Sequence, residues 1–134
     1  MISQLSSLFG SKTKAQEIIL LLKDVKSVVR HAYTEKELPL ILQFCQDNNL
    51  HIVKSRFKVL FNDNHLYSNS GIRIPENDKR SGFYFTYFSK DEKKALLALY
   101  YETTNNHQDL GKILGYPECC INFFTQNFNE NKTN

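Results

Sequence analysis

The sequence lacks several features that would point directly to an activity. It has no Trp, only three Cys and five Gly, and no apolar run long enough to cross a bilayer. It contains no Gly-rich phosphate loop, no Ser-type nucleophile elbow and no paired acid motif. Basic and acidic residues are nearly balanced, 17 against 14, for a formal net charge of +3. The chain is therefore mildly basic, which is compatible with an anionic partner.

Length and composition indicate one folded domain. The chain has 134 residues, and 41% hydrophobic residues are enough for a packed interior. Three cysteines cannot all pair within the chain, and the first ten residues have neither a charged start nor a long apolar run. We therefore expect a cytoplasmic protein with reduced thiols and no membrane partner. The Ser-rich residues 1–11 and the polar residues 129–134 are expected to be flexible.

The hydrophobic pattern predicts an α+β fold: a small, mostly antiparallel sheet covered by helices, with a C-terminal helical hairpin that carries the two adjacent cysteines. Helices are expected over residues 13–24, from a capping box at 34–37 to residue 48, from a second capping box at 89–92 to residue 103, and over 107–114 and 117–128. Strands are expected over residues 25–31, 51–61 and 83–88. Residues 62–81 hold most of the turn formers and are expected to form a long loop or a loose hairpin.

The most informative stretch is LGYPECCINFF, residues 114–124. Pro117 suits the first position of a helix, so Cys119 and Cys120 would lie in its first turn. Free amides and the helix dipole favour an anion there and lower the pKa of a thiol, although the carboxylate of Glu118 opposes this. The pair is therefore either structural, or it supplies a reactive or metal-ligating thiol.

Four residues are candidates for a thiol site: Cys119, Cys120, His107 and Tyr116. Cys119 would be the reactive or ligating thiol, Cys120 its half-buried neighbour, and His107 the base. A metal would need further ligands, because adjacent cysteines on a helix do not easily share one tetrahedral ion. The cofactor stays open, since a transition metal such as zinc or iron and no metal at all fit equally. A redox disulfide with Cys45 is a further alternative, and whether the chain is an enzyme is undecided.

The same segment also fits the spacing of a helix-turn-helix. Gly111, Gly115, Ile121 and Phe124 would occupy its small, turn and apolar positions. The second helix carries no Arg or Lys before Lys132, so we do not expect it to recognise DNA.

The LGYPECCINFF string, with the upstream His107 and Gly111, resembles the signature of an archaeal family catalogued as domain of unknown function 483. Members of that family carry a Leu-Gly-Tyr-Pro-x-Cys-Cys-apolar-x-x-Phe motif. The matching residues are Leu114, Gly115, Tyr116, Pro117, Cys119, Cys120, Ile121 and Phe124. The match covers roughly the last quarter of the chain. The resemblance implies kinship and an archaeal source, but it supplies no reaction and no catalytic residue.

A second hypothesis is a module that binds RNA or another polyanion. Lys54, Arg56 and Lys58 alternate along the expected strand with side chains about 6.6 Å apart. Arg80 opens the stretch 80–88, which partly resembles the aromatic strand of RNA-recognition domains. The competing interpretations are a solvated basic face and a strand whose aromatic rings form the core. A structural or protein-interaction domain with buried cysteines is a third possibility. We place the thiol hypothesis first because its signal is local.

Overall fold

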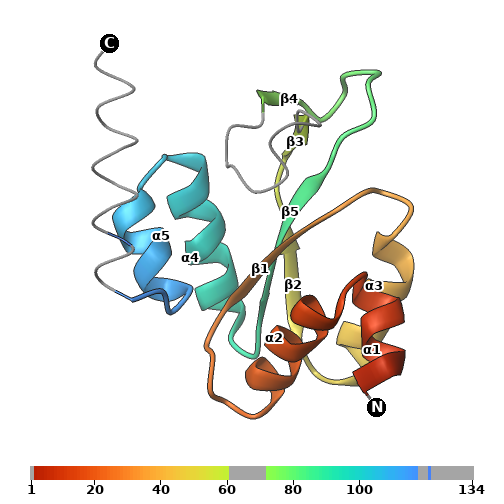
Figure 1. Ribbon diagram of the computed structural model, residues 1–134. Coiled ribbons are helices and arrows are strands. Elements are labelled where there is room, and N and C mark those ends of the chain that lie inside the picture. The colour runs from red at the N-terminus through yellow and green to blue at the C-terminus, as the bar shows by residue number, and fades with distance from the viewer. Residues whose placement is uncertain (1, 61–71, 118–120, 122–134) are drawn as a thin grey trace.

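The computed structural model describes residues 2–60, 72–117 and 121, and it has the expected α+β architecture (Figure 1). In order along these residues, the elements are α1 Ile2–Phe9, α2 Lys12–Leu22, β1 Val29–Tyr33, α3 Leu38–Asp47, β2 His51–Lys54, β3 Phe57–Leu60, β4 Ile72–Pro75, β5 Tyr84–Ser89, α4 Glu92–Thr103 and α5 His107–Ile113. The expected helix over 117–128 and the expected flexible tail over 129–134 fall outside the described residues, apart from Pro117 and Ile121. No helix within the described ranges has the length and apolar character needed to cross a membrane.

The strands that the structure describes pair only in antiparallel fashion. Strand β5 lies at the centre of a three-stranded sheet of order β1–β5–β2. Strands β3 and β4 form a separate hairpin, and a bridge between Val59 and Phe83 joins this hairpin to the start of β5. The aromatic strand predicted over residues 83–88 is thus confirmed as β5. Of the long loop or loose hairpin predicted over residues 62–81, residues 72–75 form β4, and residues 62–71 lie outside the described residues.

Helices cover both faces of the three-stranded sheet (Figure 1). Helices α1, α2 and α3 pack on one face and α4 packs on the other, with α5 against α4. Along β5 the side chains alternate, so Tyr84 and Phe88 join the first core and Tyr87 joins the second. The aromatic strand therefore supplies core residues to both layers, in agreement with the interpretation that its rings form the core.

The prediction of a flexible start at residues 1–11 is wrong for the segment that forms α1. Phe9 is fully buried, and its ring lies 5.3 Å from that of Phe44 and 5.9 Å from that of Phe88. Leu5 and Phe9 are four residues apart and therefore share the buried face of α1. The serines between them occupy the other positions of an amphipathic helix.

The single strand predicted over residues 51–61 is in fact two strands, because the chain breaks at Ser55. The Ser55 hydroxyl donates to the Phe57 carbonyl at 2.7 Å and accepts from the Phe85 amide at 3.2 Å. The buried Ser55 hydroxyl thus binds two backbone groups at the point where the chain leaves the three-stranded sheet. The break also ends the alternation of basic residues, since Lys54 is exposed and Lys58 is buried.

Neither predicted capping box forms the N-cap of its helix. The Thr34 amide and hydroxyl both donate to the Glu37 carboxylate at 2.9 Å, but the N-cap of α3 is Glu37, whose side chain does not cap the helix. Before α4 the N-cap is Asp91 rather than Ser89, and its carboxylate accepts from the Lys93 amide at 3.0 Å. Ser89 does not cap α4 because it still belongs to β5.

Candidate functional site

The thiol candidates lie only partly within the described residues. Cys119 and Cys120 fall outside them, so the contact predicted between Cys119 and His107 is not tested. His107 is the first residue of α5. Tyr116 follows a turn at Gly115, whose φ of +80° is readily adopted only by glycine, and its side chain is 45% exposed. Within the described part of the chain, no group of three His, Cys, Asp or Glu side chains could hold a metal ion.

Both flanks of the cysteine pair are anchored on α5. Gly111 packs so closely against Ile121 that an added Cβ would lie 2.7 Å from Cγ1 of the isoleucine. Ile121 is only 4% exposed, and its amide donates to the Pro117 carbonyl at 3.1 Å. The Tyr116 amide donates to the Gly111 carbonyl at 3.0 Å. Glycine at position 111 is therefore what allows the segment to return onto the helix.

Cys45 has the environment of a structural cysteine. It lies in α3, within the core on the α1–α3 face of the sheet, and is 1% exposed. Burial raises the pKa of its thiol to about 12. A thiol that is both buried and protonated is a poor nucleophile.

Two of the four basic candidates, Lys58 and Arg80, are already engaged. The Lys58 ammonium donates to the carbonyls of Asp78 and Arg80 at 2.5 and 2.6 Å. The Arg80 guanidinium donates from Nε and Nη2 to the two carboxylate oxygens of Asp78, at 3.0 and 2.9 Å. These hydrogen bonds hold the pKa of the Asp78 carboxyl well below its usual range. Lys58 and Arg80 therefore stabilise the turn after β4 rather than forming an open cationic surface.

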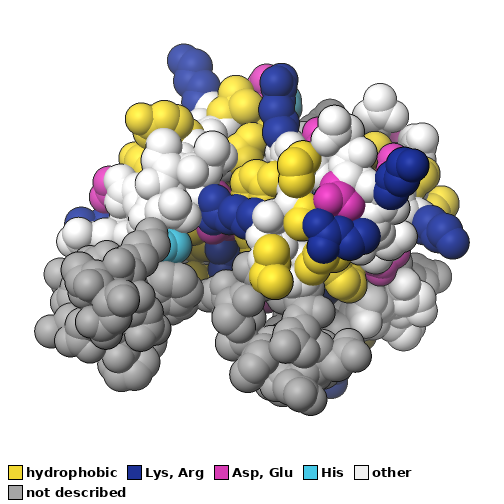
Figure 2. Space-filling view, turned by 90° about the horizontal axis from the view of Figure 1, so that it is seen from above, with side chains coloured by type: hydrophobic (Ala, Val, Ile, Leu, Met, Phe, Trp, Pro, Cys, Tyr) yellow, Lys and Arg dark blue, Asp and Glu magenta, His cyan; other side chains and the backbone are white. Residues whose placement is uncertain are grey.

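The other two candidates, Lys54 and Arg56, are exposed. The Lys54 ammonium lies 4.2 Å from the centre of the Tyr84 ring and 3.4 Å from a carboxylate oxygen of Glu76. Arg56 forms no ion pair with any residue that the structure describes. Figure 2, which views the molecule from the hairpin end, shows Lys and Arg side chains in separate groups with acidic and hydrophobic side chains between them. The predicted continuous basic face is not formed.

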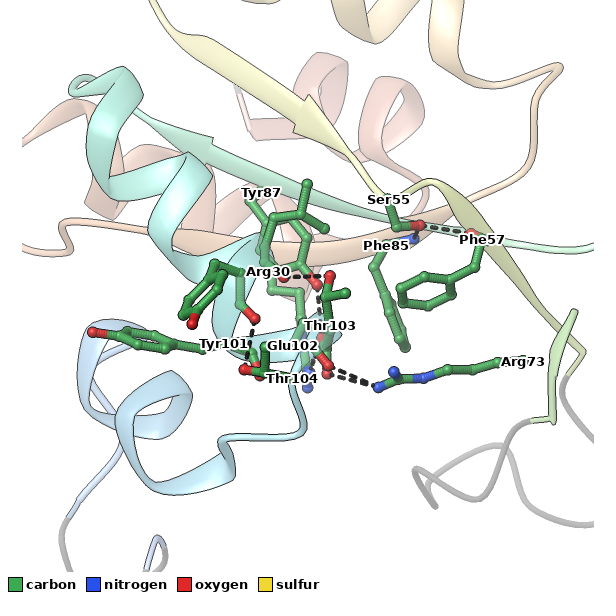
Figure 3. A network of polar contacts seen from close by, with 12 residues as sticks. Arg30, Ser55, Phe57, Arg73, Phe85, Tyr87, Tyr101, Glu102, Thr103 and Thr104 are labelled. Atoms are coloured by element: carbon green, nitrogen blue, oxygen red, sulfur yellow. Dashed lines mark hydrogen bonds and ion pairs between the residues drawn. The ribbon is translucent and has the colours of Figure 1, made fainter. Parts of the chain in front are cut away.

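A different charged cluster is assembled at the end of α4 (Figure 3). Glu102 is 3% exposed, and its Oε1 accepts from Arg30 Nη1 at 2.7 Å and from the Tyr87 hydroxyl at 2.7 Å. Arg30 on β1 and Tyr87 on β5 are direct cross-strand partners. On α4, the buried positions are Ala95, Ala98 and Glu102. The small alanines let the helix approach the sheet closely, so the carboxylate of Glu102 reaches the two donors.

Arg73 of β4 reaches the same place from the hairpin (Figure 3). Its Nη2 donates to the backbone carbonyl of Glu102 at 3.0 Å and lies 3.7 Å from the carboxylate oxygen Oε2. The carbonyls in the last turn of a helix lack helical partners, and the helix dipole favours a cation there. Arg73 therefore ties the β3–β4 hairpin to the C-terminal end of α4.

Each guanidinium also lies over an aromatic ring. Arg30 is 5.2 Å from the centre of the Phe85 ring, and Arg73 is 4.6 Å from that of Phe57. The two rings themselves meet edge to face at 6.1 Å. Cation–π attraction and ring packing thus hold both guanidiniums against one pair of phenylalanines.

The charges of this cluster are unequal. Burial opposes the charge of Arg30, but Glu102, followed by the phenols of Tyr116 and Tyr87, outweighs it and raises the pKa of the guanidinium. Among the described residues, Glu102 is the one carboxylate paired with the two guanidiniums, and Arg73 keeps 35% of its side chain exposed while Arg30 keeps 16%. Hydrogen bonds to described residues engage one nitrogen of each guanidinium, although each carries five N–H donors. Within the described part of the chain, positive charge therefore exceeds negative charge in this cluster.

Sequence reasoning missed Arg30, Arg73 and Glu102. One signal was available, because Glu102 continues the i, i+3, i+7 spacing of Ala95 and Ala98 along the small-residue face of a helix. An acid on such a face needs a buried partner. Nothing in the sequence indicated that the partners would come from β1 and from the hairpin.

The fold and the cluster define the protein as a small α+β domain with paired arginines at the end of a helix. No protein-family model, no curated protein and no solved structure matches the chain. Its function is therefore inferred from this geometry.

Proposed function

We propose that the protein binds an anionic ligand through Arg30 and Arg73. The observation that carries the proposal is the presence of two guanidiniums on one pair of aromatic rings, with Glu102 as the one carboxylate among the described residues that pairs with them. The planar fork of Arg matches the oxygens of phosphate and carboxylate groups. The proposal keeps the polyanion hypothesis drawn from the sequence but moves the site from the predicted basic face to the end of α4.

Preorganisation supports this proposal. Glu102 and the Phe85 ring hold Arg30, while the Glu102 carbonyl and the Phe57 ring hold Arg73. Side chains that are already ordered lose less conformational entropy when a ligand binds. Arg73 is the more exposed of the two and would make the first contact with the ligand.

Titration calorimetry with inorganic polyphosphate as the probe tests the proposal. Arg73→Gln should weaken binding by about tenfold, the loss of roughly 1.4 kcal/mol of charge-assisted hydrogen bonding. The matched control is Arg56→Gln, which removes an exposed arginine outside the cluster and should leave affinity unchanged. Equal affinities of the two variants would contradict the proposal, and so would a wild-type protein that does not bind polyphosphate at low salt.

A thiol-based function is the second candidate, and the anchoring of both flanks of the cysteine pair on α5 favours it. The Tyr116 amide binds the Gly111 carbonyl, and Ile121 packs against Gly111. In this proposal Cys119 is the reactive or ligating thiol, Cys120 its neighbour and His107 the base. Kinship with the archaeal domain of unknown function 483 is proposed on the same motif.

Alkylation rate against pH, together with metal analysis of protein purified without oxygen, tests the thiol function. The expected result is a depressed thiol pKa that Cys119→Ser removes and Cys120→Ser does not, or a bound metal that is lost in either variant. Thiols that all titrate near pH ~8.5 in a metal-free protein would rule it out.

A further inference from the structure

We infer that the outer face of α4 is a docking surface for an acidic amphipathic helix of a partner protein. The inference is independent of the anion site, because it uses the side of the helix that is turned away from the sheet. It rests on a stripe of exposed apolar side chains, on two lysines beside that stripe, and on a charge pattern that does not suit a second copy of the chain.

The apolar stripe consists of Leu96, Leu97 and Tyr100, whose side chains are 47%, 41% and 60% exposed. Tyr100 follows the leucines by four and three residues, so the three side chains are neighbours on the helix surface. At about 100° per residue they lie opposite the small-residue face that packs on the sheet. Single exposed apolar residues are common, but a contiguous stripe of them along one helix is typical of an interaction face.

The stripe is carried by an ordered helix. The Asp91 carboxylate caps its first turn, and the hydroxyls of Thr103 and Thr104 donate to the carbonyls of Leu99 and Tyr100 at 2.8 and 2.9 Å in its last turns. The opposite face is fixed in the core between the sheet and α5 (Figure 1). A partner would therefore meet a surface that is already formed, which lowers the entropic cost of binding.

Two lysines border the stripe at the N-terminal end of α4. Lys93 lies one turn before Leu96, so its side chain stands next to the apolar residues. Lys93 and Lys94 are exposed, and neither forms an ion pair with a residue that the structure describes. Lys90, by contrast, is already paired with Asp24 at 3.0 Å. The dipole of the helix adds positive potential at the same end. The face therefore complements a partner that places carboxylates beside its own apolar residues.

A second copy of the chain would not supply those carboxylates. Glu102 of α4 is buried, and Glu92 lies 3.6 Å from His51 of β2. Two α4 helices packed in parallel would bring like-charged lysines together. Packed antiparallel, each Lys93 would approach the end of the other helix, which carries Arg73. Like charges brought together across an interface oppose association.

Fluorescence anisotropy with a labelled synthetic peptide tests the inference. The probe is an amphipathic helical peptide of about 18 residues, with leucines on one face and glutamates beside them, and its matched peptide carries lysines in place of the glutamates. The wild type should bind the acidic peptide about tenfold more tightly than the basic one. Leu97→Ser should weaken that binding by about tenfold, and Lys93→Glu should reverse the preference between the peptides.

Three controls separate this face from the rest of the surface. Leu40→Ser and Lys36→Glu change an exposed leucine of α3 and an exposed lysine that precedes it, and they should have no effect. Arg73→Gln should weaken polyphosphate binding but leave peptide binding unchanged. Loss of peptide binding in Arg73→Gln would place the acidic peptide at the arginine cluster and contradict the inference, while the anion site would stand.

Other occupants of the face give different results. A wild-type dimer in sedimentation that Leu97→Ser dissociates would show that a second copy covers the stripe, and the inference would be wrong. Binding to vesicles of phosphatidylserine and phosphatidylcholine that Leu97→Ser abolishes, with no binding of either peptide, would make the face a membrane contact and would also overturn it. Equal binding of the two peptides, or binding of neither, contradicts it as well.

Discussion

Arg30 and Glu102 are 72 residues apart in the sequence, and a hydrogen bond of 2.7 Å joins them across the interface between the sheet and α4. The side chain of Glu102 is 4% exposed and that of Arg30 is 16% exposed, so the pair is largely removed from water. Arg73 and Tyr87 bind the same residue from two further strands. A single glutamate thus connects β1, β4 and β5 to the end of one helix.

Replacing Glu102 by Gln should destabilise the fold by about 3 kcal/mol, because it leaves the Arg30 charge buried without its carboxylate. The amide oxygen can still accept from the Tyr87 hydroxyl, so the loss reports mainly the ion pair. Urea denaturation of wild type and variant measures it. Glu92→Gln, at an exposed glutamate of the same helix, should change stability by less than ~1 kcal/mol. Similar losses of unfolding free energy in Glu102→Gln and Glu92→Gln would show that the Arg30–Glu102 ion pair does not stabilise the fold.

Gly111→Ala should destabilise the protein by roughly 1–3 kcal/mol, because the new Cβ would lie 2.7 Å from Cγ1 of Ile121. A double-mutant cycle with Ile121→Ala measures the interaction. Since Ile121→Ala removes that Cγ1 atom, the alanine at 111 should cost much less in its presence. Additive losses would mean that Gly111 matters for a reason other than contact with Ile121.

Stability should fall with acidity as His31 titrates. His31 lies between Phe9 of α1, Glu17 of α2, Tyr33 of β1 and Phe88 of β5, and burial lowers its pKa against the opposing attraction of Glu17. The unfolded chain, with a His pKa near ~6.5, then binds the proton more readily than the folded chain.

The contribution of His31 is therefore intact above pH ~6.5 and is lost as the pH falls from that value toward the depressed folded pKa. Lys14 and Lys26 act in the same direction, since both lower the pKa of His31. Denaturation free energies between pH ~7 and ~5 should show a slope that His31→Gln reduces. A slope that survives His31→Gln would assign it to other groups.

Phe9→Ala should cost about 3–5 kcal/mol, the usual loss for a fully buried Phe. A loss of that size would show that α1 unfolds cooperatively with the rest of the domain. Thermal or urea unfolding measures the loss, and Gln4→Ala, at an exposed position of α1, should be near neutral. A loss below ~1 kcal/mol for Phe9→Ala would mean that α1 does not contribute to the cooperative unit.

Cys45 should resist alkylation by iodoacetamide at pH ~8 in the native protein and react in denaturant, because its thiol is buried and its pKa is raised to about 12. Mass spectrometry of peptides assigns the label to each cysteine. Rapid native labelling of Cys45 would show that α3 opens readily from the sheet.

Local pattern predicted much of the secondary structure. The apolar period and the turn residues predicted α3, α5, the aromatic strand and the Gly115 turn, because each depends on neighbours within a few residues. The errors arose where distant contacts decided the outcome. Residues 2–9 are helical with Phe9 set against α3 and β5, and the strand after His51 ends where Ser55 meets Phe85.

The candidate site divides in the same way. The sequence by itself determined that a Gly-Tyr-Pro turn would precede the cysteines, because φ at Gly115 and the ring of Pro117 are local constraints. Only the tertiary structure decided that Arg30, Arg73 and Glu102 meet, since they come from β1, β4 and α4, separated by 72 and 29 residues of chain. The physical reason is that a turn depends on the torsions of adjacent residues, whereas a charge cluster depends on which surfaces the buried side chains bring together.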